Sequence, residues 1–540
     1  MHTIRSRRLI KYFSVICLLF MLFIPAVPVS SGSIAVDDDA PGCVSTPGQI
    51  NPYGVVYCRI DTAITDAVDG DTLNMAPGTY DQILLFYEGK NLTLLGAGES
   101  DTTITGLDIF VPVQVINGSV EIHDVTIRDG YSPASIGGGI SNNGTLTVYD
   151  STITENVDTL LGGGISNQGT LNLHRCVVSH NQASMMGGGI YNMGVMNLYS
   201  TEVRNNQVTG ADVNGGGIFN SGPGVAMVED SFIEHNEFTA PTNGYGVGIY
   251  NTGDMEIVDT SVSYNVSSGT TYGGGIFNSN ILTLSGVDVR YNTIAEGLGA
   301  GINHSCCTLS VEESWIDHNE ILGGSGSGGG IILNQPADFL NVTISNNTAT
   351  NTGGGVHSQA NLNLSNVTLY GNTAPDGGAI LHTGAFTTLT LNNVTISGNM
   401  TGGGAGTGGI RNFAQVNVRN SILAWNVNGN CLSGGSGTIV SQGYNLESLN
   451  SCALSGPGDL PNTDPNLGPL TDNGGPVNTI ALLPGSPALE AGNPAVPGSG
   501  GNACEATDAR LVVRPVGERC DIGAFESDYP YSLFLPLILR

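Results

Sequence analysis

A repeated pattern dominates this chain between residues 137 and 426. Each copy starts with a glycine cluster followed by Ile or Val, as in GGGI at 137–140, and contains an apolar residue three places before an asparagine, as in Ile153 and Asn156. Eleven copies follow one another with a mean asparagine spacing of about 27 residues. Alternating stretches such as TLTV at 145–148 occur inside the copies. A period of this length with two-residue alternation predicts short stacked strands and excludes helical repeats.

The register within each copy predicts a solenoid. From the Ile or Val that ends the glycine cluster to the following asparagine the distance is 16 residues in eight of the eleven copies, whereas the distance from that asparagine to the next cluster varies. An inward side chain has to lie over its equivalent in the next coil, while a surface loop can change length at little cost in free energy. We therefore expect stacked strands in fixed register and one variable loop per coil.

Two columns of the repeat are predicted to build the interior. The asparagines can form a ladder of amide hydrogen bonds between coils about 4.8 Å apart. The glycines allow the positive φ or the close backbone approach that a turning coil needs. The residue three places before each asparagine is always apolar and predicts a continuous inner stack of Ile153, Val178, Val203, Ile233, Val262, Val289, Ile316, Ile344, Leu369, Ile396 and Leu423.

The segments outside the eleven copies have their own signatures. Residues 60–130 show the turn and strand signals of opening coils, and IDTAITDAV from residue 60 has helical spacing that suits a cap on the core. The coiled domain is therefore predicted at 60–426, an all-β solenoid of about 14 coils. An extension at 31–59 precedes it, and a small module at 427–527 and an apolar tail at 528–540 follow.

The N-terminus predicts export. Residues 1–30 carry four basic residues, then an apolar run at 12–24, then small residues, which is the order of a secretory signal peptide. An uncleaved membrane anchor is the alternative, because the run nearly reaches the length of a spanning helix. We expect a secreted or cell-surface protein, with Cys17 inside the signal.

The other cysteines suit an oxidising compartment. Three local pairs are predicted to form disulfides, each closing a loop of about 15 to 20 residues: Cys43 with Cys58, Cys431 with Cys452, and Cys504 with Cys520. Cys306 and Cys307 are adjacent and either form a vicinal bridge or stay reduced, and the state of Cys176 is left open.

The charge of the chain limits its partners. A formal net charge of -30 excludes nucleic acid, whose phosphates require clustered Lys and Arg. An acidic polysaccharide is repelled unless a cation bridges it. We expect a monomer with no resident cofactor, and calcium is the one ion left open.

These patterns resemble known families. The repeat is similar to right-handed parallel β-helix proteins of the pectate-lyase-like fold, and its GGGI and apolar-x-x-Asn motifs resemble those of polymorphic outer membrane proteins, with Ile, Val or Leu in place of Phe. DPNLGPLTDNGGPVNTIALLPGSPALEAG, ATDAR and RPVGERCDIGAFE, within 464–526, look like the choice-of-anchor module of exported β-helix proteins, with Glu490 where Asp is usual. This resemblance implies association with the cell surface or envelope.

One copy invites a catalytic interpretation. Trp315 to His318 match a W-I-D-H stretch of pectate lyases, where acidic residues near it bind calcium that bridges substrate carboxylates. However, Ile316 and Asn319 are ordinary repeat positions, and FIEHNE at 232–237 shows the same string without tryptophan. The later lyase segments, with their proton-abstracting arginine, are absent, and the remaining carboxylates are scattered among columns. No catalytic, cofactor-binding or metal-binding residue is assigned.

A binding hypothesis rests on the column one residue before each asparagine. Ring faces in this column can pack on apolar sugar faces, although a solvated or turn-lining stack is the simpler interpretation. The column contains His180, Asn205, His235, Tyr264, Tyr291, His318 and Trp425. The Asn-x-Thr triplets at Asn341, Asn366 and Asn393 recur with the repeat and are therefore weak glycosylation signals.

The sequence thus predicts an exported, surface-associated, non-catalytic β-helix protein for adhesion or extracellular binding, with polysaccharide or envelope components as partners. The alternative is a carbohydrate-active enzyme, a polysaccharide lyase or hydrolase. Two carboxylates and a basic residue meeting on one exposed face would favour the enzyme.

Overall fold

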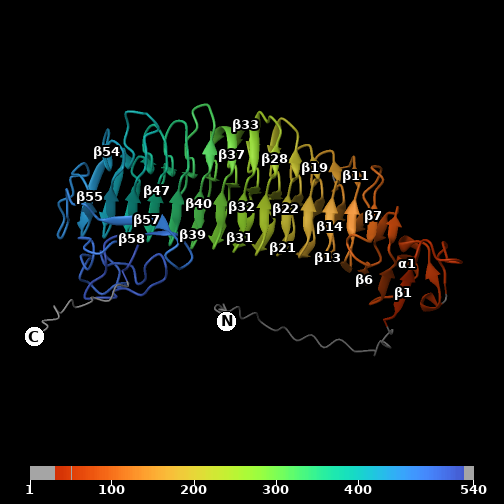
Figure 1. Cartoon of the computed structure of the whole chain (residues 1–540). Helices are drawn as coiled ribbons and strands as arrows, with labels where there is room; N and C mark the ends of the chain where they lie inside the picture. The colour runs from red at the N-terminus through yellow and green to blue at the C-terminus, as the bar shows by residue number, and fades with distance from the viewer. Residues whose placement is uncertain (1–30, 50, 135, 528–540) are drawn as a thin grey trace, which may run out of the picture.

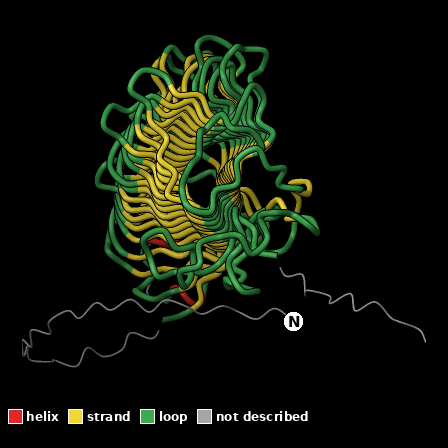
Figure 2. Tube along the Cα trace, turned by 90° about the vertical axis from the view of Figure 1, so that its left-hand side faces the viewer, coloured by secondary structure: helices red, strands yellow, loops and turns green. Residues whose placement is uncertain are grey.

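The computed structural model describes residues 31–527 except residues 50 and 135, and the predicted signal and apolar tail lie outside this range. The described chain forms a long rod of stacked coils (Figure 1), and a view along the rod shows the strands of successive coils lying over one another (Figure 2). No helix in the described part of the chain is long and apolar enough to cross a membrane.

The coils contribute strands to three long sheets, and those from β11 (Tyr131–Ser132) to β41 (Glu320–Ile321) add a fourth, shorter sheet. In one coil these are β16 (Ile165–Asn167), β17 (Thr170–His174), β18 (Val177–Ser179) and β19 (Gln182–Ala183). We call the corresponding sheets 3, 1, 2 and 4; they contain 14, 17, 15 and 10 strands, and neighbouring coils pair in parallel. The chain is thus a right-handed-type parallel β-solenoid of about 14 turns, as predicted.

Sheet 2 matters most for the site. Most of its strands are three residues long. The strands are β4 (Gly78–Tyr80), β7 (Thr102–Thr105), β10 (Thr126–Arg128), β14 (Thr152–Thr154), β18, β22 (Glu202–Arg204), β27 (Phe232–Glu234), β32 (Ser261–Ser263), β36 (Asp288–Arg290), β40 (Trp315–Asp317), β44 (Thr343–Ser345), β47 (Thr368–Tyr370), β50 (Thr395–Ser397), β53 (Ile422–Ala424) and β56 (Leu446–Glu447). In central strands such as β14, β22 and β36, the middle residue is buried and the two residues beside it face away from the core.

The ladder of strands begins before residue 60 and ends after residue 426. At the first end, β1 (Ser33–Val36) pairs with β2 (Val56–Tyr57) and β3 (Thr72–Met75). The helix α1 (Ile60–Asp66) buries Ile60 and Ala63 in the main core, where the helical spacing of the sequence suggested a cap. At the other end, β54 (Cys431–Ser433), β55 (Thr438–Gly443) and β56 add a further coil.

The interior columns are confirmed. All eleven apolar residues of the predicted inner stack are at most 1% exposed. From Asn156 to Asn426, each asparagine donates its Nδ2 to the Oδ1 of the next, at 2.9–3.1 Å. Each Oδ1 along the ladder also accepts the backbone N–H of the preceding asparagine, as Asn206 does from Asn181. Every amide of this ladder therefore has partners, and the ladder costs no unsatisfied polar group.

A second ladder was not predicted. The asparagine two residues after the GGGI isoleucine is also buried, and Asn142, Asn167, Asn192, Asn220, Asn251 and Asn278 bond in series at 2.7–2.8 Å. This ladder ends at His304, whose Nδ1 lies 3.0 Å from Asn278. Burial lowers the pKa of His304 to about 4, so its imidazole is neutral at physiological pH.

The glycine clusters are required by the backbone. In the cluster that begins at Gly187, this residue has φ 61°, and a Cβ on the next residue, Gly188, would lie 2.4 Å from the Gly216 carbonyl oxygen of the following coil. A side chain there would force the coils apart.

The C-terminal residues fold back onto the rod. A hairpin of β57 (Leu467–Thr471) and β58 (Thr479–Leu482) and the segment up to residue 527 lie against the outer face of sheet 2 (Figure 1). Residues 464–527, which we call the clasp, bury Ile422 and Ala424 of β53 against Ile480 and Phe525. Asn366 donates to the Thr507 carbonyl and Asn393 to the Gly523 carbonyl, and both side chains are fully buried. These two asparagines are therefore docking residues that a glycan cannot reach.

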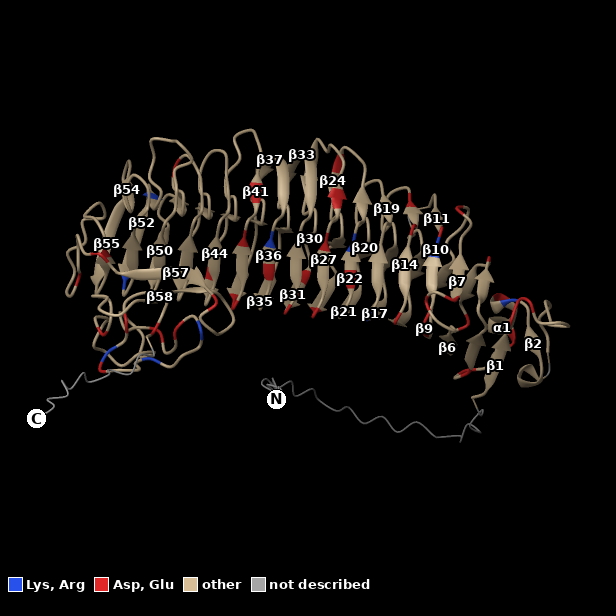
Figure 3. Ribbon diagram, in the orientation of Figure 1, with Lys and Arg blue, Asp and Glu red and all other residues tan. Residues whose placement is uncertain are grey.

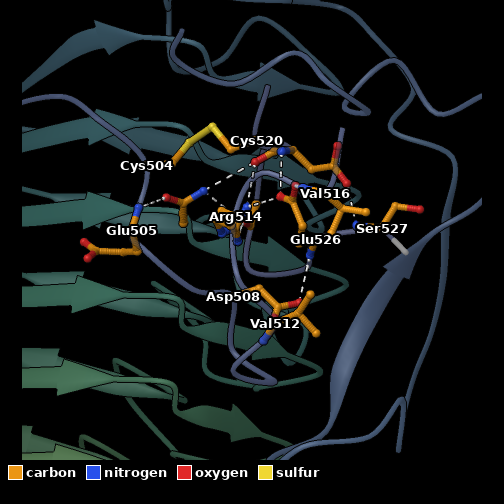
Figure 4. A network of polar contacts seen from close by, with 12 residues as sticks. Cys504, Glu505, Asp508, Val512, Arg514, Val516, Cys520, Glu526 and Ser527 are labelled. Carbon is orange, nitrogen blue, oxygen red and sulfur yellow. Dashed lines mark hydrogen bonds and ion pairs between the residues drawn. A yellow bond between two sulfur atoms is a disulfide. The ribbon is translucent and has the colours of Figure 1, made fainter. Parts of the chain in front are cut away.

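The clasp is held by buried charges (Figure 4). The fully buried guanidinium of Arg514 pairs with Glu526 at 2.9 Å and donates to the carbonyls of Asp521 and Gly523. Arg510 pairs with Asp508 and lies 3.7 Å above the ring of Phe525. A paired, fully hydrogen-bonded arginine tolerates such burial, and losing one partner leaves an uncompensated charge.

The predicted disulfides Cys43–Cys58, Cys431–Cys452 and Cys504–Cys520 are confirmed. The adjacent Cys306 and Cys307 form a vicinal disulfide, and Cys176 is a free, buried thiol. Burial raises the pKa of Cys176 to about 12, so this thiol is unreactive in the folded protein.

Candidate functional site

The outer face of sheet 2 is exposed between β10 and β36 and ends where the clasp begins. Four arginines lie on this face or at its edge, each in an ion pair: Arg128 with Asp129, Arg175 with Asp150, Arg204 with Glu202, and Arg290 with Asp288. Figure 3 shows a few basic residues along the rod among more numerous acidic ones. The face therefore offers donors and acceptors of both signs in an otherwise acidic molecule.

The predicted ring column runs along one edge of this face. Every member has a left-handed backbone, with φ between 51° and 56°, so each side chain projects from the turn that follows a sheet 2 strand. His235, Tyr264, Tyr291 and His318 stack on one another with ring centroids 4.9–5.1 Å apart. Trp425 is 47% exposed and lies further along the column.

The stacking corrects the expected use of the rings. The faces of Tyr264 and Tyr291 are covered by their neighbours, so they cannot pack on sugar faces as the sequence suggested. Only the polar edges of these rings meet solvent. The open ring faces of the stack are at its two ends, and the first of these ends is His235.

A depression lies beyond that end. Asn205 occupies the column position between His180 and His235, and its short side chain leaves a hollow of about 290 Å³. Gln182, Gln207 and Glu237, the first residues of three neighbouring sheet 4 strands, complete the lining with the ladder amides. The hollow is therefore lined entirely by polar side chains.

A second ring stack borders the opposite edge of sheet 2 and was not predicted. His123, Tyr149, His174 and Tyr199 end successive sheet 1 strands, and their centroids are 4.6–4.8 Å apart. Burial and the neighbouring Arg175 lower the pKa of His174. The sequence feature that could have predicted this stack is a ring that recurs seven residues before the ladder asparagine, as at the ends of TLTVY and TLNLH.

A depression of about 330 Å³ on the face gathers carboxylates that the sequence analysis treated as scattered. Asp230 and Asp259 come from the turns before β27 and β32, and Asp288 and Arg290 from β36. Phe232, 47% exposed, forms part of its wall. The hollow exists because the intervening strand carries serines and because the turn before β36 has Gly286, where a Cβ would lie 2.2 Å from the Asp259 carboxylate.

Two of these carboxyl groups are shifted toward protonation. Burial and the neighbouring charge of Asp230 raise the pKa of Asp259. Burial also raises the pKa of Asp288, against the opposing effect of Arg290 3.8 Å away. Groups of this kind can donate a hydrogen bond or a proton where an ordinary carboxylate cannot.

The W-I-D-H stretch has a structural explanation. Trp315 packs against the clasp residues Val477, Ala509 and Ala524, so this tryptophan marks the edge of the covered face. Both carboxylate oxygens of Asp317 are engaged: Oδ1 accepts hydrogen bonds from Ser345 and Asn346, and Oδ2 contacts His318. Among the described residues, no three His, Cys, Asp or Glu side chains are grouped to hold a metal ion.

One comparison with known protein families agrees with the repeat. Residues 341–359 match a family model described as the Chlamydia polymorphic membrane protein repeat, which supports the resemblance at this one copy. Among solved structures, the chain is similar to one titled "Crystal structure of pectate lyase Pel9A", with 12% identity, a TM-score of 0.32, and 93% of this chain and 98% of that chain covered. No curated protein matches the sequence. The resemblance of residues 464–526 to a choice-of-anchor module stays a prediction.

Proposed function

We propose that the protein is exported, associates with the cell surface, and binds extracellular glycans without cleaving them. The main support for this proposal is the depression on sheet 2, where the exposed ring of Phe232 lies beside Asp259, Asp288 and Arg290. An aromatic face for the C–H face of a sugar, with charged groups for its hydroxyls, is a chemically complete sugar site.

The charge of the molecule selects the kind of glycan. With a net charge of -30, an acidic polysaccharide is repelled, and no metal site in the described residues offers to bridge it. We therefore propose a neutral polysaccharide. The matched polymorphic membrane protein repeat and the secretory signal predicted at residues 1–30 support a place at the cell surface, where we propose the protein acts as a monomer without nucleic acid or cofactor.

A binding assay on the purified protein tests this proposal. Labelled neutral and acidic polysaccharides are incubated with and without calcium, and both bound glycan and new reducing ends are measured. We expect binding of a neutral glycan and no new ends. Phe232→Ala should weaken binding at least tenfold. Val225→Ala, at an equally exposed apolar residue on sheet 1 of the same coil, should leave it unchanged. Equal binding by both variants and the unaltered protein would contradict the proposal.

Hydrolysis at the same depression is the second candidate, because Asp259, Asp288 and Arg290 meet there on one exposed face, which is the arrangement that favours an enzyme, and because burial raises the pKa of Asp288. Glycosidases use one protonated and one ionised carboxyl group on either side of the bond that breaks. If this candidate is right, new reducing ends appear, and Asp288→Asn abolishes them while glycan binding persists.

A further inference from the structure

We infer that the hollow at Asn205 is a slot for one pyranose ring of a neutral glycan, held between the imidazoles of His180 and His235. This inference rests on the proposed function and adds a subsite at the other edge of sheet 2. It also gives two rings of the column a role in sugar binding, which the rings inside the stack cannot have because their faces are covered.

The spacing of the coils sets the width of the slot. β18, β22 and β27 are consecutive parallel neighbours, so the residues that follow them lie one coil apart. Strands in a sheet are about 4.8 Å apart, which places the column positions of His180 and His235 about 10 Å from each other. The rings further along stack at 4.9–5.1 Å. A gap of two such spacings accommodates one further ring. The protein places no ring there, because the column residue between His180 and His235 is Asn205.

The position is singular within the described column. His318 is followed by Asn346 and two glycines, so no second ring faces it across a gap. Asn346 is also engaged, since its amide donates to Asp317. Only at Asn205 does a residue without a ring lie between two residues with rings, so only there can a ligand be sandwiched.

The lining identifies the ligand as a sugar. Asn205, Gln182 and Gln207 carry amides with both donors and acceptors, and Glu237 adds acceptors. Thr209 and Thr239 accept hydrogen bonds from the Gln182 and Gln207 amide nitrogens at 3.5 and 2.8 Å, which orients these amides. A polyhydroxylated ring satisfies such groups at its edge and presents C–H groups to the imidazole faces. An apolar aromatic ring would leave the amides of the slot unpaired on binding.

The neighbouring coils supply the matched variants. Tyr264 and Tyr291 have φ 55° and 54°, and Asn205 has φ 54°, so tyrosine fits the backbone at Asn205 and asparagine fits it at Tyr291. Asn205→Tyr should close the slot by completing the stack. Tyr291→Asn should open an equivalent slot between Tyr264 and His318, because their rings then face each other across two coils.

The experiment measures hexasaccharide binding to the full chain by calorimetry, using gluco-, manno- and galacto-configured oligomers. The imidazole signals of His180 and His235 are followed by NMR, and indole is the aromatic comparison. We expect one of these oligomers to shift both imidazole signals. Asn205→Tyr should weaken this binding at least tenfold, and Tyr291→Asn should raise the number of sites by one.

Three other outcomes would contradict the slot, the class of ligand, or the slot together with the proposed function. If Phe232→Ala weakens oligosaccharide binding while Asn205→Tyr does not, the slot is wrong and the proposed function stands. If indole shifts the two imidazole signals and the oligomers do not, the ligand class is wrong. If no oligomer or polysaccharide binds the unaltered protein, both the slot and the proposed function are wrong.

Discussion

The exposed coils, from β10 to β36, and the covered coils, from β44 to β53, share one interior and differ in their outer faces. Asn265 in the exposed part and Asn372 in the covered part make the same five ladder bonds, with distances that agree within about 0.2 Å. Outside, the exposed strands carry Phe232, Asp288 and Arg290, whereas the covered strands carry Thr343, Thr368 and Thr395. The inward columns thus maintain the fold, and the outward columns decide what a coil contacts.

The covered face carries small polar residues where the backbone of the clasp hydrogen-bonds to it. Thr343 donates its hydroxyl to the Asn478 carbonyl, and the Ala524 N–H donates to Thr395 Oγ1. A large side chain at these positions would hold the clasp off the sheet. The exposed face has no such constraint, so rings and charges can accumulate there.

The largest expected effect comes from Arg514→Met, which removes the buried guanidinium and leaves Glu526 unpaired. Breaking such a pair costs about 3–5 kcal/mol. We expect the clasp to unfold and the amides of β44 to β53 to exchange faster in hydrogen-exchange mass spectrometry, while β14 to β32 keep their protection. Arg204→Met, at an exposed ion pair, is the control and should cost less than about 1 kcal/mol. Equal loss of protection along the rod would show that the two regions are not independent.

The second prediction concerns the interior that both regions share. Asn265→Ala and Asn372→Ala each deprive a backbone N–H and an amide of their acceptor, and about 3 kcal/mol should be lost from the free energy of unfolding in either case. Chemical denaturation measures both. The ladder bonds of Asn372 involve no clasp residue, so the two losses should be alike. A much smaller loss at Asn372 would mean that the clasp compensates for the broken ladder.

The interior was predictable from the sequence because stacking imposes one period on every inward residue. Ile153 and its equivalents, and the ladder from Asn156 to Asn426, could be assigned from spacing alone. The second ladder had a similar signal in GGGI-x-N, but it fades after Asn278, where histidine, leucine and serine replace asparagine. Surface columns vary in residue type from coil to coil, so a column that changes from asparagine to other residues halfway along the chain resembles one in the sequence.

The outer face could not be predicted in the same way. Asp259 and Asp288 belong to different columns, a turn and a strand, and they meet only because Gly286 leaves space between them. The clasp joins residues more than a hundred positions apart, such as Asn366 and Thr507. The sequence contained one sign of it, the repeated Asn-Val-Thr, which appears only where the face is covered.

The third prediction compares one column across the boundary. Phe232 and Trp315 are both first residues of sheet 2 strands, but Trp315 packs on the clasp and Phe232 faces solvent. Trp315→Ala should destabilise the clasp by about 2 kcal/mol, from the apolar area it exposes. Phe232→Ala should change the free energy of unfolding by less than about 0.5 kcal/mol. Urea denaturation followed by fluorescence of the remaining tryptophan, Trp425, reports the first change. Equal destabilisation by the two variants would mean that the clasp contributes nothing at this edge.

The fourth prediction is a pH dependence confined to the clasp. Burial and the nearby Glu526 raise the pKa of Asp521 from 3.8 to about 7, although Arg514 opposes the shift. Because the folded clasp holds this proton more tightly than the unfolded chain does, the contribution of Asp521 to stability is full below pH 4 and is lost as the pH rises to 7. Hydrogen exchange of residues 464–527 should therefore quicken across this range beyond its intrinsic pH dependence, and the exposed coils should show no matching change. Asp521→Asn should flatten this slope even where it lowers the absolute stability, since the amide no longer titrates. A slope that survives the substitution would assign the pH dependence to another group, and the exposed and covered regions would then differ in packing without differing in charge.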